Sequence, residues 1–231
     1  MYYNPSYEDG SIIKISAVEP QTVNYESNED MPIFLQSPWK GNRNRQPEYE
    51  LTDKDVLSEY VKLLRIPQED QIIFKSHIIS GFIDGISWAI PLFDAEQGSA
   101  KSTITKAIKC LIDPEDQDTI KMPEKIDDIA VTLNKHYINN FDNLSYLTGD
   151  VSDFFSSAVT GTSHPKRKHY TNDEEFSIKL KSRIILNGIQ PNLSKTDLYD
   201  RLIVYHLLPI PEEEKLTDAK IQERIAWMTP R

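Results

Sequence analysis

The stretch Ala95-Glu96-Gln97-Gly98-Ser99-Ala100-Lys101-Ser102-Thr103 decides the fold of this chain. It follows an apolar, strand-like run over residues 86–93 and precedes apolar residues at helical spacing from Ile104 to Leu111. A strand, a turn of small residues, Lys-Ser and a helix form the context of a phosphate-binding loop. Backbone N–H groups at the helix start would face an anion, and the helix dipole adds partial positive charge. The stretch therefore predicts a nucleoside triphosphate site.

The loop departs from the usual pattern of Gly, four residues, Gly, Lys and Ser or Thr. Both consensus glycines are alanine here, Ala95 and Ala100, and Gly98 lies between them. Glycine allows positive φ and close approach of the backbone, so each replacement carries a cost. An ordinary helix start, with Ser102 as its N-cap and Lys101 as a solvated charge, fits the same residues. Other parts of the chain must decide between these two interpretations.

Composition limits the class of protein. The chain has 231 residues, of which 39% are hydrophobic and 27% charged, as in soluble globular proteins. We expect no membrane span, because no run of about eighteen apolar residues occurs. The single Cys110 excludes an internal disulfide and fits the cytoplasm. A net charge of −10 disfavours nucleic-acid binding through bulk charge, so any such contact needs a local basic patch.

Strand and helix patterns alternate along the chain, which predicts an α/β fold with a parallel sheet covered by helices on both faces. We expect an N-terminal extension over residues 1–51, partly β or irregular, and a core over 52–231. Within the core we expect a helical lead-in over 52–85, a nucleotide-binding part over 86–211 and a short C-terminal helix over 212–231.

Three polar residues lie at the ends of further apolar segments. Asp142 ends a strand-like segment and would hold Mg²⁺ directly or through water. Asn187 lies where a second strand is expected to end, within reach of a γ-phosphate or the attacking water. Arg201 precedes the last strand and would reach the nucleotide of a neighbouring subunit. The open alternatives are a solvated Asp at a turn, an Asn-Gly turn, and a surface salt bridge of Arg201 with Asp197 or Asp200.

Four motifs carry a family resemblance. In order they are Gly98-Ser99-Ala100-Lys101-Ser102-Thr103, Phe141-Asp142-Asn143-Leu144-Ser145, Ile185-Leu186-Asn187-Gly188 and Leu198-Tyr199-Asp200-Arg201-Leu202. Together they resemble the AAA+-related P-loop ATPases of phages, plasmids and other mobile elements, a group related to superfamily 3 helicases. The resemblance covers roughly residues 50–215. It implies an ASCE-type P-loop NTPase core with the phosphate-loop strand central in the sheet.

The resemblance also implies roles for single residues. Lys101 would neutralise β- and γ-phosphate charge, and Ser102 with Asp142 would hold Mg²⁺. Asn187 would be the sensor, and Arg201 the arginine finger, a group that contributes about 10³–10⁵ in rate. The residues implied to bind ATP are Ala95, Glu96, Gln97, Gly98, Ser99, Ala100, Lys101, Ser102 and Thr103.

Asn143 departs from the family pattern, which has Glu after the metal-binding Asp. Asparagine can orient water by hydrogen bonding, but it does not accept a proton at neutral pH. Three outcomes stay open: slow hydrolysis, hydrolysis through another acid such as Asp150 or Asp153, or no hydrolysis.

The densest basic cluster of this acidic chain lies in residues 161–171 and contains Lys166, Arg167, Lys168 and Tyr170. Strand-like alternation follows over residues 176–181. A hairpin at this place resembles the DNA-contacting hairpin of superfamily 3 helicases. The basic residues would then contact phosphates of single- or double-stranded DNA, and Tyr170 would stack on a base. A solvated, mobile loop is the alternative.

The sequence therefore predicts a cytoplasmic, homo-oligomeric ATPase that binds ATP and Mg²⁺ and serves DNA transactions of a mobile element. One alternative is a nucleotide-dependent scaffold that hydrolyses little because of Asn143. The other is an interaction module whose loop matches by accident.

Overall fold

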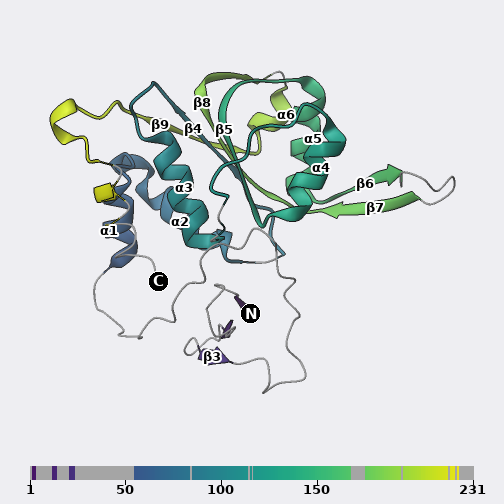
Figure 1. The fold of residues 1–231 in the computed structure, drawn as a ribbon, viewed down its shortest axis with the longest axis horizontal. Coiled ribbons are helices and arrows are strands. Elements are labelled where there is room, and N and C mark those ends of the chain that lie inside the picture. The colour runs from purple at the N-terminus through teal and green to yellow at the C-terminus, as the bar shows by residue number, and fades with distance from the viewer. Residues whose placement is uncertain are drawn as a thin grey trace.

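A parallel β-sheet forms the centre of the molecule (Figure 1). The computed structural model describes residues 2–3, 12–14, 21–23, 55–83, 85–113, 115, 117–167, 175–193, 195–217, 219–221 and 223. The sheet has the strand order β5-β8-β4-β9, with bounds Ile138–Leu147, Arg183–Leu193, Ile90–Ala95 and Leu202–Leu207. An isolated parallel bridge between Ile120 and Phe141 extends the sheet beyond β5. The strand before the predicted loop, β4, is thus central, as expected.

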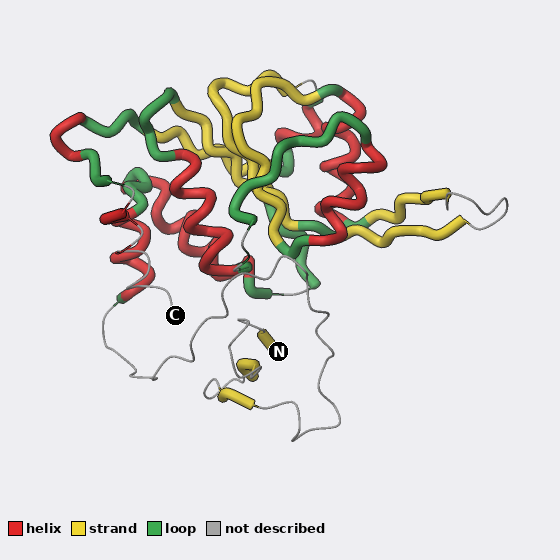
Figure 2. The backbone as a smooth tube through the Cα atoms, viewed as in Figure 1, coloured by secondary structure: helices red, strands yellow, loops and turns green. Residues whose placement is uncertain are grey.

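Helices cover both faces of this sheet, as Figure 2 shows. On one face lie α1 (Val56–Leu63), α2 (Gln71–Gly81) and α3 (Lys101–Ile112). On the other lie α4 (Ile126–Lys135), α5 (Gly149–Thr160) and the short α6 (Thr196–Tyr199). Short 3-10 turns, η2 (Gln68–Asp70) and η3 (Glu212–Glu214), precede α2 and follow β9. The predicted α/β fold with helices on both faces is confirmed.

Alternation along the strands divides the apolar core into two layers. Leu92 and Ile184 pack in the cluster that contains the buried faces of α4 and α5. Phe93 and Ile185, their chain neighbours, pack in the cluster that contains α1, α2 and α3. Because successive side chains of a strand point to opposite faces, a continuous apolar run fills both layers.

The first helix of the predicted helical lead-in is α1, and residues 52–54 lie outside the described part of the chain. Asp55 is the N-cap of α1, and its carboxylate accepts a hydrogen bond from the backbone N–H of Ser58 at 2.9 Å. Capping by an Asp side chain satisfies one of the free N–H groups of a helix start. Tyr60 and Val61 then bury the inner face of α1 in the core.

Strand β8 does not end at Gly188, where the sequence predicts its end, but continues to Leu193. Beyond Gly188, β8 pairs with β5 alone. Pro191, which has no N–H group to donate, therefore does not lie in a central part of the sheet. Gly188 lies within the strand, and a Cβ atom there would stand 2.2 Å from the carbonyl oxygen of Leu144. The Asn-Gly pair therefore serves close strand packing, and the alternative of a simple turn is wrong.

A two-stranded antiparallel hairpin, β6 (Thr162–Arg167) and β7 (Glu175–Leu180), projects from the sheet between α5 and β8 (Figure 1). The buried side chains of Ile178 and Leu180 anchor its base in the core. The expected hairpin is thus present, and Lys166 and Arg167 belong to β6. Lys168 and Tyr170 lie outside the described residues.

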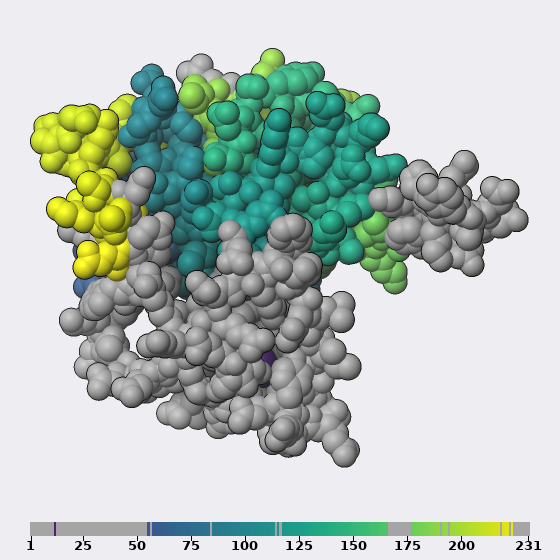
Figure 3. Space-filling view, viewed as in Figure 1, coloured from purple at the N-terminus to yellow at the C-terminus, as the bar shows by residue number. Residues whose placement is uncertain are grey.

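The segment after β9 folds back beside the predicted loop. The backbone N–H of Ile210 donates to the carbonyl of Gly98 at 3.4 Å, and Glu214 forms an ion pair with Arg65 at 2.6 Å. Figure 3 shows this yellow segment against the darker early elements of the core.

Near the N-terminus the described residues form a small antiparallel sheet of β1 (Tyr2–Tyr3), β2 (Ile12–Lys14) and β3 (Gln21–Val23). The division of the chain at residue 51 and a C-terminal helix over 212–231 stay predictions. Among the helices of the described residues, none is both long and apolar enough to cross a membrane.

Candidate nucleotide-binding site

The loop between β4 and α3 contains the two left-handed residues that its turn requires. Gly98 has φ +85°, and Ala100 has φ +59°. Ala95 ends β4 and is buried, and it is not among the described residues with positive φ. The cost of losing a consensus glycine therefore falls on Ala100 and not on Ala95.

Lys101 projects back over the turn. Its Nζ donates to the carbonyl oxygens of Ala95 at 2.6 Å and Glu96 at 2.8 Å. Partial burial lowers the pKa of Lys101, while the charges of Asp94 and Asp142 oppose that shift. An ammonium in this position is partly desolvated, which strengthens its attraction for an anion.

The first turn of α3 presents backbone donors. Its N-cap residue is Ala100, whose methyl side chain cannot accept a hydrogen bond from the helix start. Ser99 instead closes the turn, because its hydroxyl donates to the carbonyl of Glu96 at 2.7 Å. Free N–H groups at a helix start, together with Lys101, form a site suited to phosphate oxygens.

Ser102 and Asp142 meet although their elements are distant in sequence. The Ser102 hydroxyl donates to Asp142 Oδ1 at 3.1 Å. Strand β8 lies between β4 and β5, so this contact spans three strands. The sequence predicts that the strand ends at Asp142, but β5 continues to Leu147, so Asp142 lies within it. A hydroxyl and a carboxylate are hard oxygen ligands of the kind that Mg²⁺ prefers. No group of three or more His, Cys, Asp or Glu side chains suited to a metal occurs among the described residues.

Asn187 lies directly behind this pair and is 1% exposed. Its Oδ1 accepts a hydrogen bond from the backbone N–H of Asn143 at 3.1 Å, and its Nδ2 donates to the hydroxyl of Thr105 at 3.3 Å. The same hydroxyl accepts from Asn140 at 3.1 Å. This network explains why β5 carries a buried asparagine. Thr105 and Asn140 were not assigned a role from the sequence, although a polar residue in a buried strand was the available signal.

Asn143 occupies a left-handed conformation with φ +58°. The pairing of β5 with β8 shifts register between Phe141 and Leu144, so Asn143 is part of an irregularity in the strand. Asparagine adopts this conformation more easily than other non-glycine residues. Asn143, which stands where the resembled AAA+ pattern has Glu, is therefore matched to the local backbone.

Arg201 lies at the opposite end of the sheet from the loop. Strand β9 begins beside Ile90 and ends beside Ala95, which separates Arg201 from the loop by roughly 17 Å of strand. Its Nη2 lies 3.5 Å from both carboxylate oxygens of Asp197, which is the surface salt bridge considered as an alternative. In this arrangement Arg201 does not reach the loop of its own subunit.

Three further acids, Asp94, Asp150 and Asp153, have different surroundings. Asp94, on β4 just before the loop, lies 3.4 Å from His206 Nδ1 and acts on the pKa of Lys101. Asp94 is a charged residue inside an apolar strand, a pattern that marks a site residue at the level of sequence. Asp153 forms an ion pair with Lys195 at 3.3 Å, and Asp150 lies in the first turn of α5.

The family model for the actinomycete integrative conjugative element replication protein matches residues 62–224. A comparison with curated proteins found no match. Two solved structures of the C-terminal region of NrS-1 share the fold over 98% of this chain, with 11% and 13% identity and TM-scores of 0.51 and 0.50. A JCV helicase structure matches 75% of the chain at 14% identity with a TM-score of 0.44.

The chain spans about half to two thirds of the length of these solved structures, 50% of the JCV helicase chain and 64% and 63% of the NrS-1 chains. At such low identity the NrS-1 likeness supports the fold alone.

Proposed function

This chain belongs to the actinomycete integrative conjugative element replication protein family, and we propose that it is an ATPase that binds Mg-ATP and hydrolyses it during DNA replication of a mobile element. Family membership confirms the resemblance to proteins of mobile elements that the motifs indicated. The use of ATP, the DNA contact, the oligomer and the action in the cytoplasm are parts of the proposal.

The observation that carries the proposal is the 3.1 Å contact between Ser102 and Asp142. The helix start with Lys101 and the carboxylate of Asp142, in the middle of β5, face one another across β8. An ordinary helix start needs no such partner, because Ser102 as an N-cap would bond to its own helix. The pairing therefore favours the nucleotide site over the accidental match.

The residues present suit Mg-ATP. Phosphate oxygens would take over the hydrogen bonds that Lys101 now donates to the carbonyls of Ala95 and Glu96. The N–H groups of the first α3 turn would face the same phosphates. Ser102 and Asp142 would hold Mg²⁺, which supplies charge neutralisation on the β- and γ-phosphates. Asn187 would keep Asn143 in place through the bond to its N–H group.

The β6–β7 hairpin is the proposed DNA contact, through Lys166 and Arg167. Positive side chains on a projecting hairpin bind phosphates even when the whole chain is acidic. We expect single-stranded DNA to raise ATP turnover. Replacing both residues with Glu should abolish that stimulation and leave basal turnover unchanged, as measured by phosphate release. Loss of basal turnover in a folded variant would contradict the assignment of the hairpin.

Arg201 is proposed to act on the nucleotide of a neighbouring subunit, because it cannot reach its own loop. The variants Arg201→Ala and Lys101→Ala should each lose turnover, about 10³-fold or more for the arginine. In a mixture of the two, some interfaces pair an intact loop with an intact Arg201, so turnover should reappear. A mixture as inactive as its components would argue against an arginine finger.

A nucleotide-dependent scaffold is the second candidate, and Asn143 favours it. An amide does not accept a proton, so the water that attacks the γ-phosphate lacks the usual base. The scaffold predicts ATP binding that depends on Lys101, together with turnover that does not rise above that of Lys101→Ala. Measurable turnover that is lost in Asp142→Asn would reject it.

A further inference from the structure

A basic pocket opens at the amino ends of β5 and β8, at the end of the sheet opposite the candidate nucleotide site. Its volume is about 360 Å³. The residues that line it come from the end of α4, the start of β5 and the segment between β7 and β8: Leu133, Asn134, Lys135, His136, Tyr137, Lys179, Leu180, Lys181, Ser182 and Arg183. This volume lies in the range of about 300–1,000 Å³ typical of small-ligand pockets and suits one nucleotide unit.

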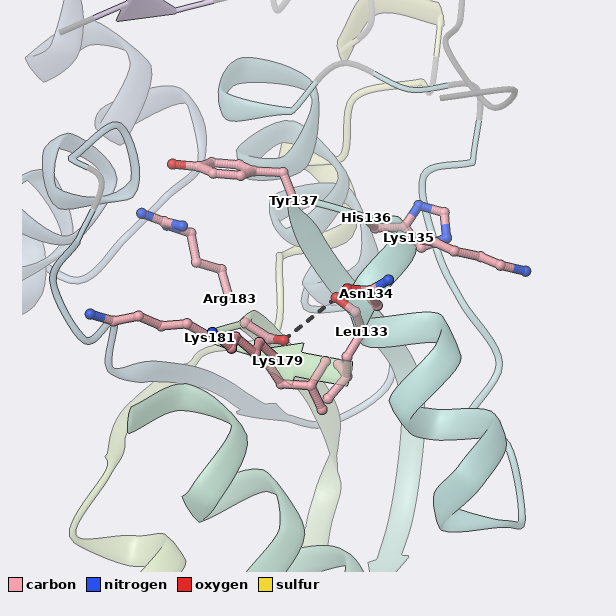
Figure 4. A pocket seen from close by; sticks show the side chains of 10 residues that line it. Leu133, Asn134, Lys135, His136, Tyr137, Lys179, Lys181 and Arg183 are labelled. Carbon is pink, nitrogen blue, oxygen red and sulfur yellow. Dashed lines mark hydrogen bonds between the residues drawn. The ribbon is translucent and has the colours of Figure 1, made fainter. Parts of the chain in front are cut away.

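Charge distinguishes this pocket from the rest of an acidic chain. Four of its lining residues are lysine or arginine, and none of the lining residues that the structure describes is acidic. Figure 4 shows Tyr137, Lys181 and Arg183 projecting to one side, whereas Lys135 points away from them. A carboxylate at the rim, that of Glu115, lies 2.6 Å from His136 Nδ1. Cations gathered with no acidic side chain among the described lining residues create a positive potential that attracts anions.

Arg183 forms a fixed wall of the pocket. It is buried, and its Nη2 donates to the carbonyl of Ile83 at 2.7 Å. Its guanidinium carbon lies 4.2 Å from the centre of the Tyr137 ring. Its Nε is buried and has no hydrogen-bond partner among the described residues. A buried donor without a partner is costly, which points to a ligand that supplies an acceptor.

The pocket is continuous with the hairpin. Strand β7 ends at Leu180, and Lys181 and Arg183 are among the next three residues. Lys181 also donates to the carbonyl of Gly85, next to the loop that Arg183 holds. A strand of nucleic acid that follows the hairpin from Lys166 toward its base would therefore meet these cations next.

We propose that this pocket is a second binding subsite for single-stranded nucleic acid, one that takes a single phosphate and its nucleotide at the base of the hairpin. The inference rests on the DNA role proposed above and adds a site to it. Lys179, Lys181 and Arg183 supply cations for the phosphate, and Tyr137, which is 40% exposed, supplies an aromatic surface for a base. This aromatic surface favours nucleic acid over an acidic protein segment, which would need the cations alone.

The test measures binding of a fluorescein-labelled oligothymidylate by anisotropy over a series of salt concentrations. Lys179→Glu with Lys181→Glu should weaken binding about tenfold or more and lower the slope of log K against log salt by about 0.7, the value for one lost phosphate contact to a single strand. The matched control, Lys62→Glu with Lys121→Glu, changes exposed lysines outside the pocket by the same charge and should leave the slope unchanged.

A second measurement needs no substitution and so does not depend on folding of a variant. Acetylation of the wild-type protein, followed by mass spectrometry, should show Lys179 and Lys181 protected by the oligothymidylate, with Lys62 unprotected. Unchanged acetylation at both pocket lysines in the presence of bound DNA would overturn the proposal.

Separate outcomes distinguish this proposal from the function it rests on. If Lys166→Glu with Arg167→Glu weakens DNA binding but the pocket variant does not, the pocket proposal alone fails. If the wild-type protein binds no oligothymidylate, the DNA role fails with it. If the pocket variant loses affinity for labelled polyglutamate and keeps its affinity for DNA, the pocket takes an acidic protein segment and the proposal is wrong.

Discussion

At the scale of single residues, the site contains two non-glycine residues in left-handed conformations, Ala100 and Asn143. Each stands where the P-loop ATPase pattern that the motifs resemble has a different residue. The two cases differ in their cost, because asparagine tolerates this conformation and alanine does not. Both lead to predictions about stability.

Replacing Ala100 with Gly should stabilise the protein by about 1 kcal/mol, because glycine removes the steric cost of φ +59°. The measurement is the free energy of unfolding in urea. Ala107→Gly, in the interior of α3, is the control and should destabilise by about 1 kcal/mol. A loss of stability in Ala100→Gly would contradict the loop geometry.

Replacing Asn143 with Glu should cost about 1 kcal/mol of stability, since Glu gains no relief from the left-handed backbone. Asn143→Gly should be nearly neutral by the same argument. Thermal or urea unfolding compares the three proteins. If the Glu variant were as stable as the Gly variant, the strained conformation at this position would be refuted. Any test of catalysis with Asn143→Glu must therefore be read together with its stability.

At the scale of elements, close approach of β5 and β8 fixes the site. Gly188→Ala would place a Cβ atom 2.2 Å from the backbone oxygen of Leu144, so the two strands must move apart. We expect a loss of about 2–3 kcal/mol, as for other overpacked positions, and weaker ATP binding because Asn187 and Asp142 shift. In Gly149→Ala the new atom meets only the flexible side chain of Lys195, and stability should hold. Equal stability of the two variants would disprove the tight packing.

His77 on α2 makes the core sensitive to acid. Its Nε2 donates to the carbonyl of Ala89 at 2.8 Å, and its Nδ1 accepts from the Tyr205 hydroxyl at 3.3 Å. Burial lowers the pKa of His77 from 6.5 to about 4, although the bond to Ala89 opposes the shift. The neutral ring thus favours the folded state, and this stability is complete above pH 6.5 and lost as the pH falls toward 4.

The loss across this window should be about 3 kcal/mol, because one pKa unit is worth about 1.4 kcal/mol. Urea unfolding between pH 7 and pH 4 measures it. In His77→Gln, which keeps a hydrogen-bonding side chain, the dependence on pH should be smaller by that amount. Parallel pH profiles of the two proteins would show that His77 does not titrate as described.

At the scale of the whole molecule, the sequence predicted the architecture and missed the contacts that assemble it. The alternation of apolar segments was enough for the sheet, its covering helices and the hairpin. The extension of β8 past Gly188 was not readable, because Asn-Gly is also a frequent turn and only the neighbour β5 decides between the two.

The site residues also fall into those that the sequence predicts and those that only contacts between strands reveal. The order of Lys101, Asp142 and Asn187 along the chain predicts that the three residues gather at one end of the parallel strands. In the structure they lie on the same side of the sheet's length, close to the carboxyl end of β4. The network through Thr105 and Asn140 could not be predicted, because it depends on which side chains meet across β8. Arg201 lies away from them, so its proposed role requires a second subunit.

The central claim is that Lys101 meets a phosphate. Isothermal titration of Mg-ATP measures it most directly, with Lys106→Ala as the control on the same helix, where the lysine faces Asp118 at 3.8 Å. We predict that the wild type and Lys106→Ala bind alike and that Lys101→Ala binds at least about tenfold more weakly, because a charge-assisted hydrogen bond is worth about 1.5–3 kcal/mol. Equal affinity of Lys101→Ala and the wild type, or no binding by the wild type, would contradict the account.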